Sequence, residues 1–501
     1  MEAAALERML PDERATAEFG QDIAAALRAG DVILLEGDLG AGKTTLARAL
    51  VRALAGDPEL EVPSPTFTLV QTYATRVPVA HVDLYRLGSP DEVDELGLDE
   101  AVRSGAVVVE WPQRAAGRLP GEAATIALSD HDAGRIARIR GPKHFIARLA
   151  RSLEIRTFLD TAGWPGASRT FLTGDASARG YEVVSLPGRP DRIVMNAPAS
   201  PLGAPIRDGR TYAEIAHIAR SVHAFVAVDR VLADAGLAVP EIEAADLDRG
   251  LLLIGHLGDG TFLDGGEPVA ERYVAAAALL ADMHGRTWPQ TVSLDGGTYT
   301  IPPYDREAML IEAELLLDWY LPFATGKPVQ DGDRADFRAA WNAVLDRLAG
   351  CETSIVLRDY HSPNIIWRPE RQGRDRLGVI DFQDALIGPA AYDVASLALD
   401  ARVTIPLELE RATVEAYAEA RSAAGAFDRA AFDAAYAIMG TQRNSKILGI
   451  FVRLDRRDGK PAYLRHLPRI RAYLVRSLPH PALAEVRDLY ARFGLGMEPA
   501  P

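Results

Sequence analysis

Two phosphate-handling motifs of unrelated kinds lie on this chain of 501 residues. Residues 37–44 read GDLGAGKT and have the GxxxxGK[ST] spacing of a P-loop. Asp359 and Asn364, followed by Asp381, have the spacing of a kinase catalytic loop and its metal-binding aspartate. The first motif builds a nucleotide switch and the second a phosphotransferase. The sequence therefore predicts a fusion of two nucleotide-using domains.

The composition is that of a soluble globular protein, with 48% hydrophobic and 25% charged residues. Cys351 is the only cysteine, which excludes an intramolecular disulfide and agrees with a reducing compartment. The first residues have no basic-then-apolar signal pattern, and no apolar run approaches the ~20 residues that span a bilayer. We therefore expect a cytoplasmic protein without membrane contact. The net charge of −15 opposes direct wrapping of nucleic acid, so any role near RNA is expected to pass through a partner.

Residues 1–152 have the pattern of an α/β P-loop NTPase domain, with a linker expected over 153–168. Helical periodicity is found over residues 12–27 and 45–54. Unbroken apolar runs predict buried parallel strands over residues 32–35, 79–82 and 106–109. Alternation about Asp132-Ala133-Gly134 predicts a hairpin over residues 126–139.

The P-loop explains how phosphate would be held. Its glycines let the backbone N–H groups point inward, and the following helix adds its positive end. Lys43 is expected to reach the β- and γ-phosphates of ATP, and the Thr44 hydroxyl to bind Mg²⁺. The chain has few lysines, so a lysine at this position is a specific signal. The expected nucleotide-binding residues are Gly37, Asp38, Gly40, Ala41, Gly42, Lys43, Thr44 and Thr45.

Four ordered motifs carry a family resemblance: residues 37–45, 62–68, 81–87 and 109–112. Together they resemble TsaE, the small ATPase of the bacterial complex that makes threonylcarbamoyladenosine at position 37 of tRNA. The resemblance implies ATP hydrolysis against a TsaB–TsaD pair, with tRNA reached only indirectly. It also implies that Asp83 helps hold Mg²⁺, that Thr66 lies in a nucleotide-sensing segment, and that Glu110 and Trp111 lie at the nucleotide site.

The residues themselves leave alternatives open. Asp83 ends a buried strand, where a carboxylate suits a hard cation, but a solvated aspartate also fits there. Glu110 is a candidate to orient the attacking water or to bind the metal through water, or it forms a structural ion pair. Trp111 either stacks on the base or packs in the core.

Residues 169–501 have the pattern of an α+β bilobal domain of the protein-kinase-like, aminoglycoside-phosphotransferase type. A small lobe is expected over about 169–258 and a large helical lobe over about 259–501. Strands are expected over residues 170–185, 192–195, 251–254, 355–357 and 378–380, and a helix over residues 212–235. Asp359 is expected to accept the proton of the substrate hydroxyl, while Asn364 and Asp381 hold Mg²⁺.

The kinase half departs from protein kinases at two points. Leu357 stands two residues before Asp359, where protein kinases have histidine. No lysine lies between Lys143 and Lys327, so the lysine that pairs the phosphates is missing, and Met195 occupies its expected place. Either an arginine such as Arg179 or Arg192 replaces it, or the lobe is catalytically weak.

Five further motifs resemble AmgK, a family of aminoglycoside-phosphotransferase-like kinases: residues 174–177, 194–198, 280–284, 357–364 and 442–444. The resemblance implies phosphorylation of N-acetylmuramate and N-acetylglucosamine at the anomeric hydroxyl in cell-wall recycling. It places Gly174 and Ser177 over the ATP phosphates, although an ordinary hairpin turn also fits them. Asn196 stands where this family usually has aspartate.

Several residues near these motifs have structural interpretations as well as functional ones. His284 is expected to be a core histidine and Asp393 a helix cap. His361 and Gln383 are expected either to contact sugar hydroxyls or to pack. Two alternatives for the whole chain remain: a kinase half that only binds nucleotide or takes a choline- or aminoglycoside-like substrate, and a P-loop half that acts as an ATP-gated scaffold.

Overall fold

The structure, a computed structural model, describes residues 4–172, 179–199 and 203–495. It divides into two compact units. The N-terminal unit comprises Met1–Asn196, Glu243–Asp246 and Leu251–Ile254, and the C-terminal unit comprises Ala197–Ile242, Leu247–Gly250 and Gly255–Pro501. The N-terminal unit therefore contains the P-loop domain and, in addition, the strands expected in the kinase small lobe.

The P-loop domain is built on a seven-stranded sheet. Its strands are β1 Ala4–Leu10, β2 Val32–Glu36, β3 Val70–Tyr73, β4 Val79–Asp83, β5 Ala106–Glu110, β6 Ala123–His131 and β7 Gly134–Gly141, in the spatial order β1-β7-β6-β2-β5-β4-β3. The central pairs β2–β5, β2–β6 and β4–β5 are parallel, and the outer pairs are antiparallel. β4 and β5 are buried throughout, as their apolar sequences predict. The short or edge strands β1 and β3 were not predicted.

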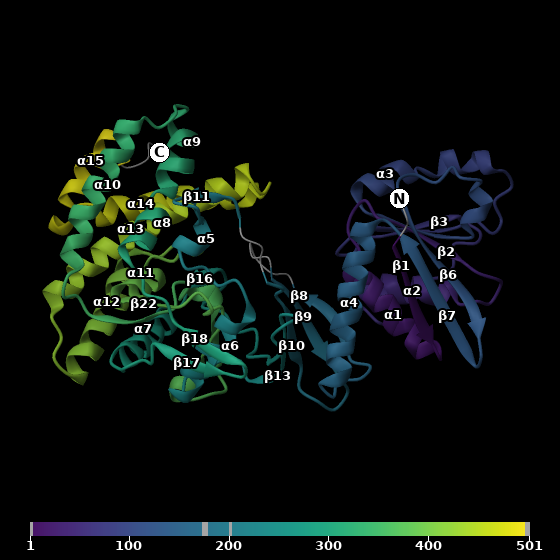
Figure 1. Cartoon of the computed structure of the whole chain (residues 1–501), viewed down its shortest axis with the longest axis horizontal. Coiled ribbons are helices and arrows are strands. Elements are labelled where there is room, and N and C mark those ends of the chain that lie inside the picture. Colours follow the sequence, from purple (N-terminus) through teal and green to yellow (C-terminus); the bar gives the residue numbers. More distant parts are fainter. Residues whose placement is uncertain (1–3, 173–178, 200–202, 496–501) are drawn as a thin grey trace. The chain divides into compact units, whose positions relative to one another are not determined.

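Helices cover both faces of this sheet (Figure 1). They are α1 Glu13–Ala26, α2 Lys43–Ala55, α3 Leu98–Ser104 and α4 Lys143–Thr161. α1, α2 and α4 share one core with the sheet, whereas α3 packs on the opposite face. Asp12 caps the start of α1, and its side chain accepts a hydrogen bond of 2.7 Å from the Ala15 amide. α1 and α2 are in close contact, because a Cβ added at Gly20 would lie 2.6 Å from the Ala49 Cβ.

A second, five-stranded sheet follows α4, and we call it the small-lobe sheet. Its strands are β8 Ser168–Leu172, β9 Gly180–Ser185, β10 Arg192–Asn196, β13 Ile242–Asp246 and β14 Leu251–Gly255, in the spatial order β13-β14-β10-β9-β8. The segment expected to link the two halves, 153–168, is not a separate linker, because α4 runs through it to Thr161. The turn after α4 is held by Trp164, which is buried and donates a hydrogen bond of 2.7 Å to Glu243.

The C-terminal unit is mostly helical. Its helices are α5 Tyr212–Ile215, α6 Val222–Asp234, α7 Ala270–His284, α8 Arg306–Ala313, α9 Leu321–Thr325, α10 Asp331–Leu345, α11 Ala391–Ala398, α12 Leu407–Ala424, α13 Arg429–Arg456, α14 Leu467–Ser477 and α15 Ala484–Arg492. The long α13 packs against α11 and α14. The single helix expected over residues 212–235 is instead two helices, because His217 adopts a left-handed conformation with φ 52°.

Strand pairs complete the C-terminal unit. They are β11 Pro205–Arg207 with β12 Arg210–Thr211, β15 Leu263–Asp264 with β16 Glu267–Pro268, β17 Thr291–Leu294 with β18 Gly297–Thr300, β19 Thr353–Val356 with β22 Leu386–Pro389, and β20 Ile365–Trp367 with β21 Leu377–Val379. The last two pairs frame the kinase motif. Among the described residues, none of the helices combines the length and apolarity needed to cross a bilayer.

Asp229 on α6 makes the stability of the fold depend on pH. It is 6% exposed, and its Oδ1 atom has no hydrogen-bond partner among the described residues. Burial raises the pKa of Asp229 to about 7. The pKa of Asp229 is thus higher in the folded protein than in the unfolded chain. The contribution of Asp229 to stability is therefore most favourable at low pH, where the side chain is protonated, and is lost as the pH rises toward 7.

We expect Asp229→Asn to increase the free energy of unfolding by about 2–4 kcal/mol at pH 8, since asparagine has no charge to desolvate. The gain should shrink as the pH is lowered to 5. Thermal unfolding of both proteins at several pH values measures it. An equal difference at pH 5 and pH 8 would mean that the Asp229 charge is not its source.

Candidate functional sites

The P-loop joins β2 to α2 and takes the conformation that its glycines allow. Gly37, Gly40 and Gly42 all have positive φ angles, of 142°, 81° and 97°. A Cβ at Gly37 would lie 2.5 Å from the backbone oxygen of Leu128, so a larger residue does not fit there. Within the loop the Ala41 amide donates to the Asp38 carbonyl at 3.1 Å. The strand–loop–helix order that the motif requires is therefore present.

Lys43 is the first residue of α2 and is 4% exposed. Its Nζ atom donates to the carbonyl oxygens of Gly37 and Asp38, each at 2.8 Å, and so bridges the loop. Nζ also lies 3.7 Å from the centre of the Trp111 ring. Burial lowers the pKa of Lys43, and the negative charges of Glu110 and Asp83 act in the opposite direction. This cation and both predicted acids therefore share one site.

The acids come from the ends of neighbouring parallel strands, where Asp83 on β4 is paired in register with Glu110 on β5. The Thr44 hydroxyl donates to Glu110 Oε2 at 2.7 Å. Glu110 Oε1 lies 2.9 Å from His81 Nε2, and both side chains are buried. The predicted Thr44 and Glu110 are thus in direct contact. His81, which fixes the carboxylate, was not predicted as a site residue.

Asp83 is held by the segment that contains Thr66. Asp83 Oδ2 accepts hydrogen bonds from Ser64 Oγ at 2.6 Å and Thr66 Oγ1 at 2.8 Å, and Oδ1 accepts from the Tyr85 amide at 2.9 Å. The 62–68 segment is therefore connected to the acid at the end of β4. A change in the hydrogen bonds of Asp83 would therefore act directly on Thr66.

Arg135 is a second site residue that the sequence did not reveal. It lies on β7, donates to the Gly40 carbonyl at 3.0 Å, and approaches Gly42 so closely that an added Cβ there would be 3.0 Å from its Nη1. Nothing in the hairpin sequence connects it with a loop about ninety residues earlier. Thr45, in the first turn of α2, is half-buried.

The kinase motif forms a compact turn structure in the C-terminal unit. The pairing of Ile365 with Val379 brings the flanking residues Asn364 and Asp381 together. Asn364 Nδ2 donates to Asp381 Oδ2 at 3.2 Å and to the Asp359 carbonyl at 3.0 Å, and Gln383 Nε2 donates to Asp381 Oδ1 at 2.8 Å. The three predicted residues Asp359, Asn364 and Asp381 are thus joined. Asp381 itself is left-handed, with φ 60°.

Asp393 holds the backbone of this loop through two hydrogen bonds. Its carboxylate accepts hydrogen bonds from the amides of Leu357 at 2.6 Å and Arg358 at 3.0 Å. Burial raises the pKa of Asp393 to about 7, although these two bonds favour the ionised form. The expectation that Asp393 caps a helix is wrong: it lies inside α11, and its hydrogen bonds go to the catalytic loop. They stabilise the left-handed Arg358, with φ 69°.

A buried ionic cluster lies behind the loop. Lys446 Nζ is 2.8 Å from Glu312 Oε1, and Arg358 and Tyr304 also bind Glu312. Burial alone would raise the pKa of Glu312, but Arg358 and Lys446 outweigh it and lower the pKa to about 2. The cluster carries one positive charge in excess. His284, by contrast, is a core histidine: it bonds Tyr417 at 3.0 Å, and burial lowers its pKa to about 3.

The structure describes only some of the site residues predicted in the small lobe. Gly174 and Ser177 lie outside the described residues. Met195 is buried on β10, and the next residue, Asn196, accepts bonds of 3.0 and 2.8 Å from Arg151 of α4. Arg192, at the other end of β10, is paired with Glu243 at 2.6 Å. Arg192 is therefore engaged in an ion pair, and the replacement of the missing lysine by Arg179 stays a prediction.

Comparisons with known proteins match the two halves separately. The model of the family described as threonylcarbamoyl adenosine biosynthesis protein TsaE matches residues 10–138, and that of the phosphotransferase enzyme family matches residues 168–434. N-acetylmuramate/N-acetylglucosamine kinase of Caulobacter vibrioides is 35% identical over 348 residues, which cover 67% of this chain and 94% of that protein.

The N-terminal half has its own relatives. The tRNA threonylcarbamoyladenosine biosynthesis protein TsaE of Rickettsia bellii is 41% identical over 108 residues, which cover 21% of this chain and 74% of that protein. The crystal structure of Bacillus subtilis YdiB aligns with 31% of this chain and 98% of its own length, at 27% identity and a TM-score of 0.27.

Proposed function

The chain belongs to the TsaE family over residues 10–138 and to the phosphotransferase enzyme family over residues 168–434, and we propose that it is a bifunctional ATP-using enzyme. Its N-terminal half is an ATPase that supports the synthesis of threonylcarbamoyladenosine at position 37 of tRNA. Its C-terminal half transfers phosphate from ATP to the anomeric hydroxyl of N-acetylmuramate and N-acetylglucosamine. The relatives' names and identities carry these assignments.

In the N-terminal site, the loop amides and Lys43 bind the phosphates of ATP. Thr44 and Asp83 are the residues that would hold Mg²⁺, which would neutralise phosphate charge. A hydroxyl and a carboxylate are oxygen ligands of the kind that this ion prefers. Glu110, fixed by His81 and Thr44, orients the water that attacks the γ-phosphate. The hydrogen bond from Thr66 to Asp83 supports a role of that segment in sensing the nucleotide.

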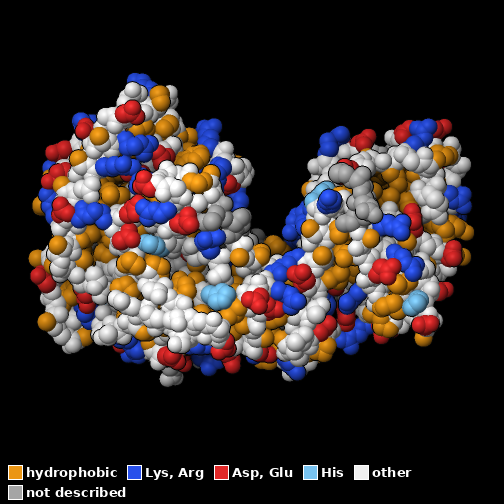
Figure 2. All heavy atoms as spheres, viewed as in Figure 1, with side chains coloured by type: hydrophobic (Ala, Val, Ile, Leu, Met, Phe, Trp, Pro, Cys, Tyr) orange, Lys and Arg blue, Asp and Glu red, His pale blue; other side chains and the backbone are white. Residues whose placement is uncertain are grey.

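The N-terminal half works with partner proteins, which we propose to be of the TsaB and TsaD type. Two large apolar side chains border the nucleotide site and are exposed: Leu39 by 79% and Phe67 by 81%. Such side chains favour a protein that covers the site. Acidic and basic side chains are interspersed on the face shown in Figure 2, and the net charge is −15, which supports indirect rather than direct access to tRNA.

In the C-terminal site, Asp359 takes the proton of the sugar hydroxyl as its oxygen attacks the γ-phosphorus, and ADP leaves with the bonding electrons. Asn364 and Asp381 would hold Mg²⁺, which would neutralise charge on the phosphates. An amide oxygen and a carboxylate are ligands that this ion prefers. The contact between Asn364 and Asp381, at 3.2 Å, is the observation that supports a working site most directly.

The test uses the full-length protein with Mg-ATP and, separately, N-acetylmuramate, N-acetylglucosamine, choline and kanamycin. Phosphorus NMR should detect a sugar 1-phosphate with both amino sugars and no product with choline or kanamycin. The absence of lysine between Lys143 and Lys327 favours one other function, a half that binds nucleotide without transfer. ATP binding without product on any acceptor would establish that function instead.

A further inference from the structure

The helix α4 belongs to two hydrophobic cores at once. Phe145 and Leu149, in its first half, pack in the core of the P-loop domain. Ile155 and Leu159, in its second half, pack in the core that includes Val184 and other residues of the small-lobe sheet. Because α4 is continuous, it connects the two cores without a flexible segment between them. The P-loop domain and the small-lobe sheet accordingly belong to the same compact unit.

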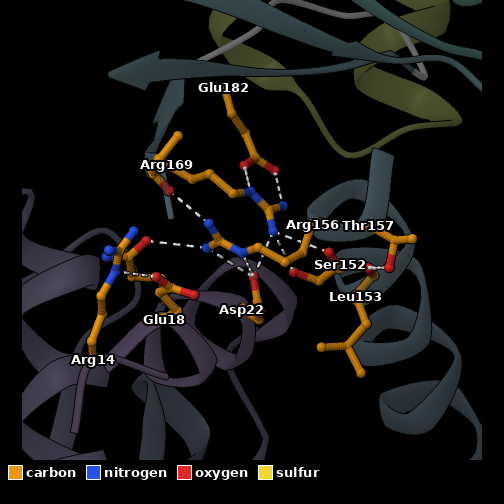
Figure 3. A network of polar contacts seen from close by, with 11 residues as sticks. Arg14, Glu18, Asp22, Ser152, Leu153, Arg156, Thr157, Arg169 and Glu182 are labelled. Carbon is orange, nitrogen blue, oxygen red and sulfur yellow. Dashed lines mark hydrogen bonds and ion pairs between the residues drawn. The ribbon is translucent and has the colours of Figure 1, made fainter. Parts of the chain in front are cut away.

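Between these cores lies a buried network that we call the ionic junction, formed by Asp22, Arg156, Arg169 and Glu182 (Figure 3). Asp22 Oδ1 accepts from Arg169 Nη1 at 2.7 Å and from Arg156 Nε at 3.2 Å. Arg169 also forms a two-pronged pair with Glu182, at 2.6 and 2.9 Å. The four charges balance.

The members of the ionic junction come from different parts of the unit. Asp22 lies on α1 of the P-loop domain, Arg156 on α4, Arg169 on β8 and Glu182 on β9. The side chains of Asp22 and Arg156 are 0% exposed and that of Arg169 is 1% exposed, so water does not compensate these charges. Without Asp22, Glu182 would still pair with Arg169, but the other hydrogen-bond partners of Arg156, the Ala167 carbonyl and Gln21, are neutral. Such an uncompensated buried charge is strongly unfavourable.

Two further contacts bring the P-loop domain against β8. The Arg76 guanidinium lies 4.7 Å from the centre of the Phe171 ring. A Cβ at Gly56 would be 3.9 Å from the Thr170 side chain. β8 is an edge strand of the small-lobe sheet, and three consecutive residues of it, 169–171, contact the P-loop domain. β8 as a whole stays largely exposed, so these contacts attach the strand to the P-loop domain through single side chains, above all the buried Arg169.

We propose that the P-loop domain has a second role, as the structural base on which the small-lobe sheet of the kinase folds, exerted through the ionic junction. The kinase half is then not autonomous, which gives a physical reason for the fusion of the two halves. A kinase fragment that begins at residue 153, after the end predicted for the P-loop domain, would keep Arg156 and Arg169 and lose Asp22. The proposal concerns folding and does not depend on which sugar the kinase accepts.

The test compares two variants of the full-length protein, Asp22→Asn and Asp31→Asn. Asp31 is a matched control: it is 7% exposed and pairs with Arg148 of α4 at 2.6 Å, but its hydrogen-bond partners, Arg28 and Arg148, both belong to the P-loop domain. Hydrogen exchange at the backbone amides of β9 and β14 should be at least tenfold faster in Asp22→Asn than in the unmodified protein. In Asp31→Asn it should change less than twofold. Unchanged exchange in Asp22→Asn, or equal changes in both variants, would overturn the proposal.

A charge-balanced double variant covers the case in which Asp22→Asn does not fold. Asp22→Asn combined with Arg156→Gln leaves Arg169 paired with Glu182 and restores neutrality. It should be soluble, with exchange at β9 and β14 within threefold of the unmodified protein. A double variant that is insoluble, or that exchanges as fast as Asp22→Asn, would contradict a role for the charge balance. Because this readout needs no sugar substrate, it is independent of the proposed kinase specificity.

Discussion

Asp359→Asn is expected to lower the rate of phosphate transfer to N-acetylmuramate by about 10²–10⁴-fold, the usual contribution of a positioned proton acceptor. Asparagine keeps the shape of the side chain but cannot take the proton of the attacking hydroxyl. The backbone carbonyl of Asp359, which accepts from Asn364 at 3.0 Å, is unaffected by the substitution. The loop should therefore keep its conformation. Release of ADP in the presence of N-acetylmuramate, coupled to a spectroscopic readout, measures the loss.

The matched control for Asp359→Asn is Asp375→Asn, which removes an exposed carboxylate from the same unit. It should leave the transfer rate within twofold of that of the unmodified protein. N-terminal ATP hydrolysis, measured without sugar, should be equal in both variants. If Asp359→Asn keeps more than a tenth of the transfer rate, the proposed role of this carboxylate is wrong. Loss of both activities in a folded protein would mean that the two sites are not separate.

The second large effect is expected at Lys43. Lys43→Ala should weaken ATP binding by the N-terminal half by at least about 10²-fold, since charge-assisted hydrogen bonds to phosphate contribute about 1.5–3 kcal/mol each. Lys43 Nζ now bridges two carbonyls of the loop at 2.8 Å, so the cation already lies where the phosphates are expected. Support for tRNA modification, assayed with TsaB- and TsaD-type proteins, should be lost as well. Lys143→Ala, which changes an exposed lysine, is the control and should have no effect.

Glu110→Gln separates catalysis from scaffolding in the same assay. Glutamine can still accept the hydrogen bond from Thr44 but has no charge, so ATP should bind while its hydrolysis slows. If hydrolysis is needed, tRNA modification should slow in proportion. Full modification with bound but unhydrolysed ATP would instead support the ATP-gated scaffold. Either way, kinase activity should persist, because Glu110 lies in the P-loop domain.

The family matches confirm the two resemblances and the fold class predicted from the sequence. Both could be predicted because each motif is contained in a short stretch of the chain. The glycines of the P-loop, and the spacing from Asp359 to Asn364, encode their geometry within a few residues. Contacts between distant residues were not predictable in this way. Asp393 was interpreted as a cap from its neighbours in sequence, whereas its hydrogen bonds go to residues 357 and 358.

The same reason explains why the expected linker was wrong. The linker was predicted because the α/β pattern ends near residue 150 and residues 164–166 read as a turn, but the helix α4 continues to Thr161. Its two halves pack in different cores, so neither core alone reveals the whole helix. The partners of Arg156 are Asp22 and Gln21, 134 and 135 positions away, and Ala167 after the helix. No local pattern in the sequence predicts such a pairing.

The shared helix α4 also restricts how the chain can vary in length. Adding one residue to an α-helix turns everything beyond it by about 100° and moves it by about 1.5 Å. One residue gained or lost between Leu149 and Ile155 would thus rotate Ile155 and Leu159 off the sheet they pack against, while Phe145 stayed in place. The number of residues in this stretch is therefore fixed by the two cores that α4 joins.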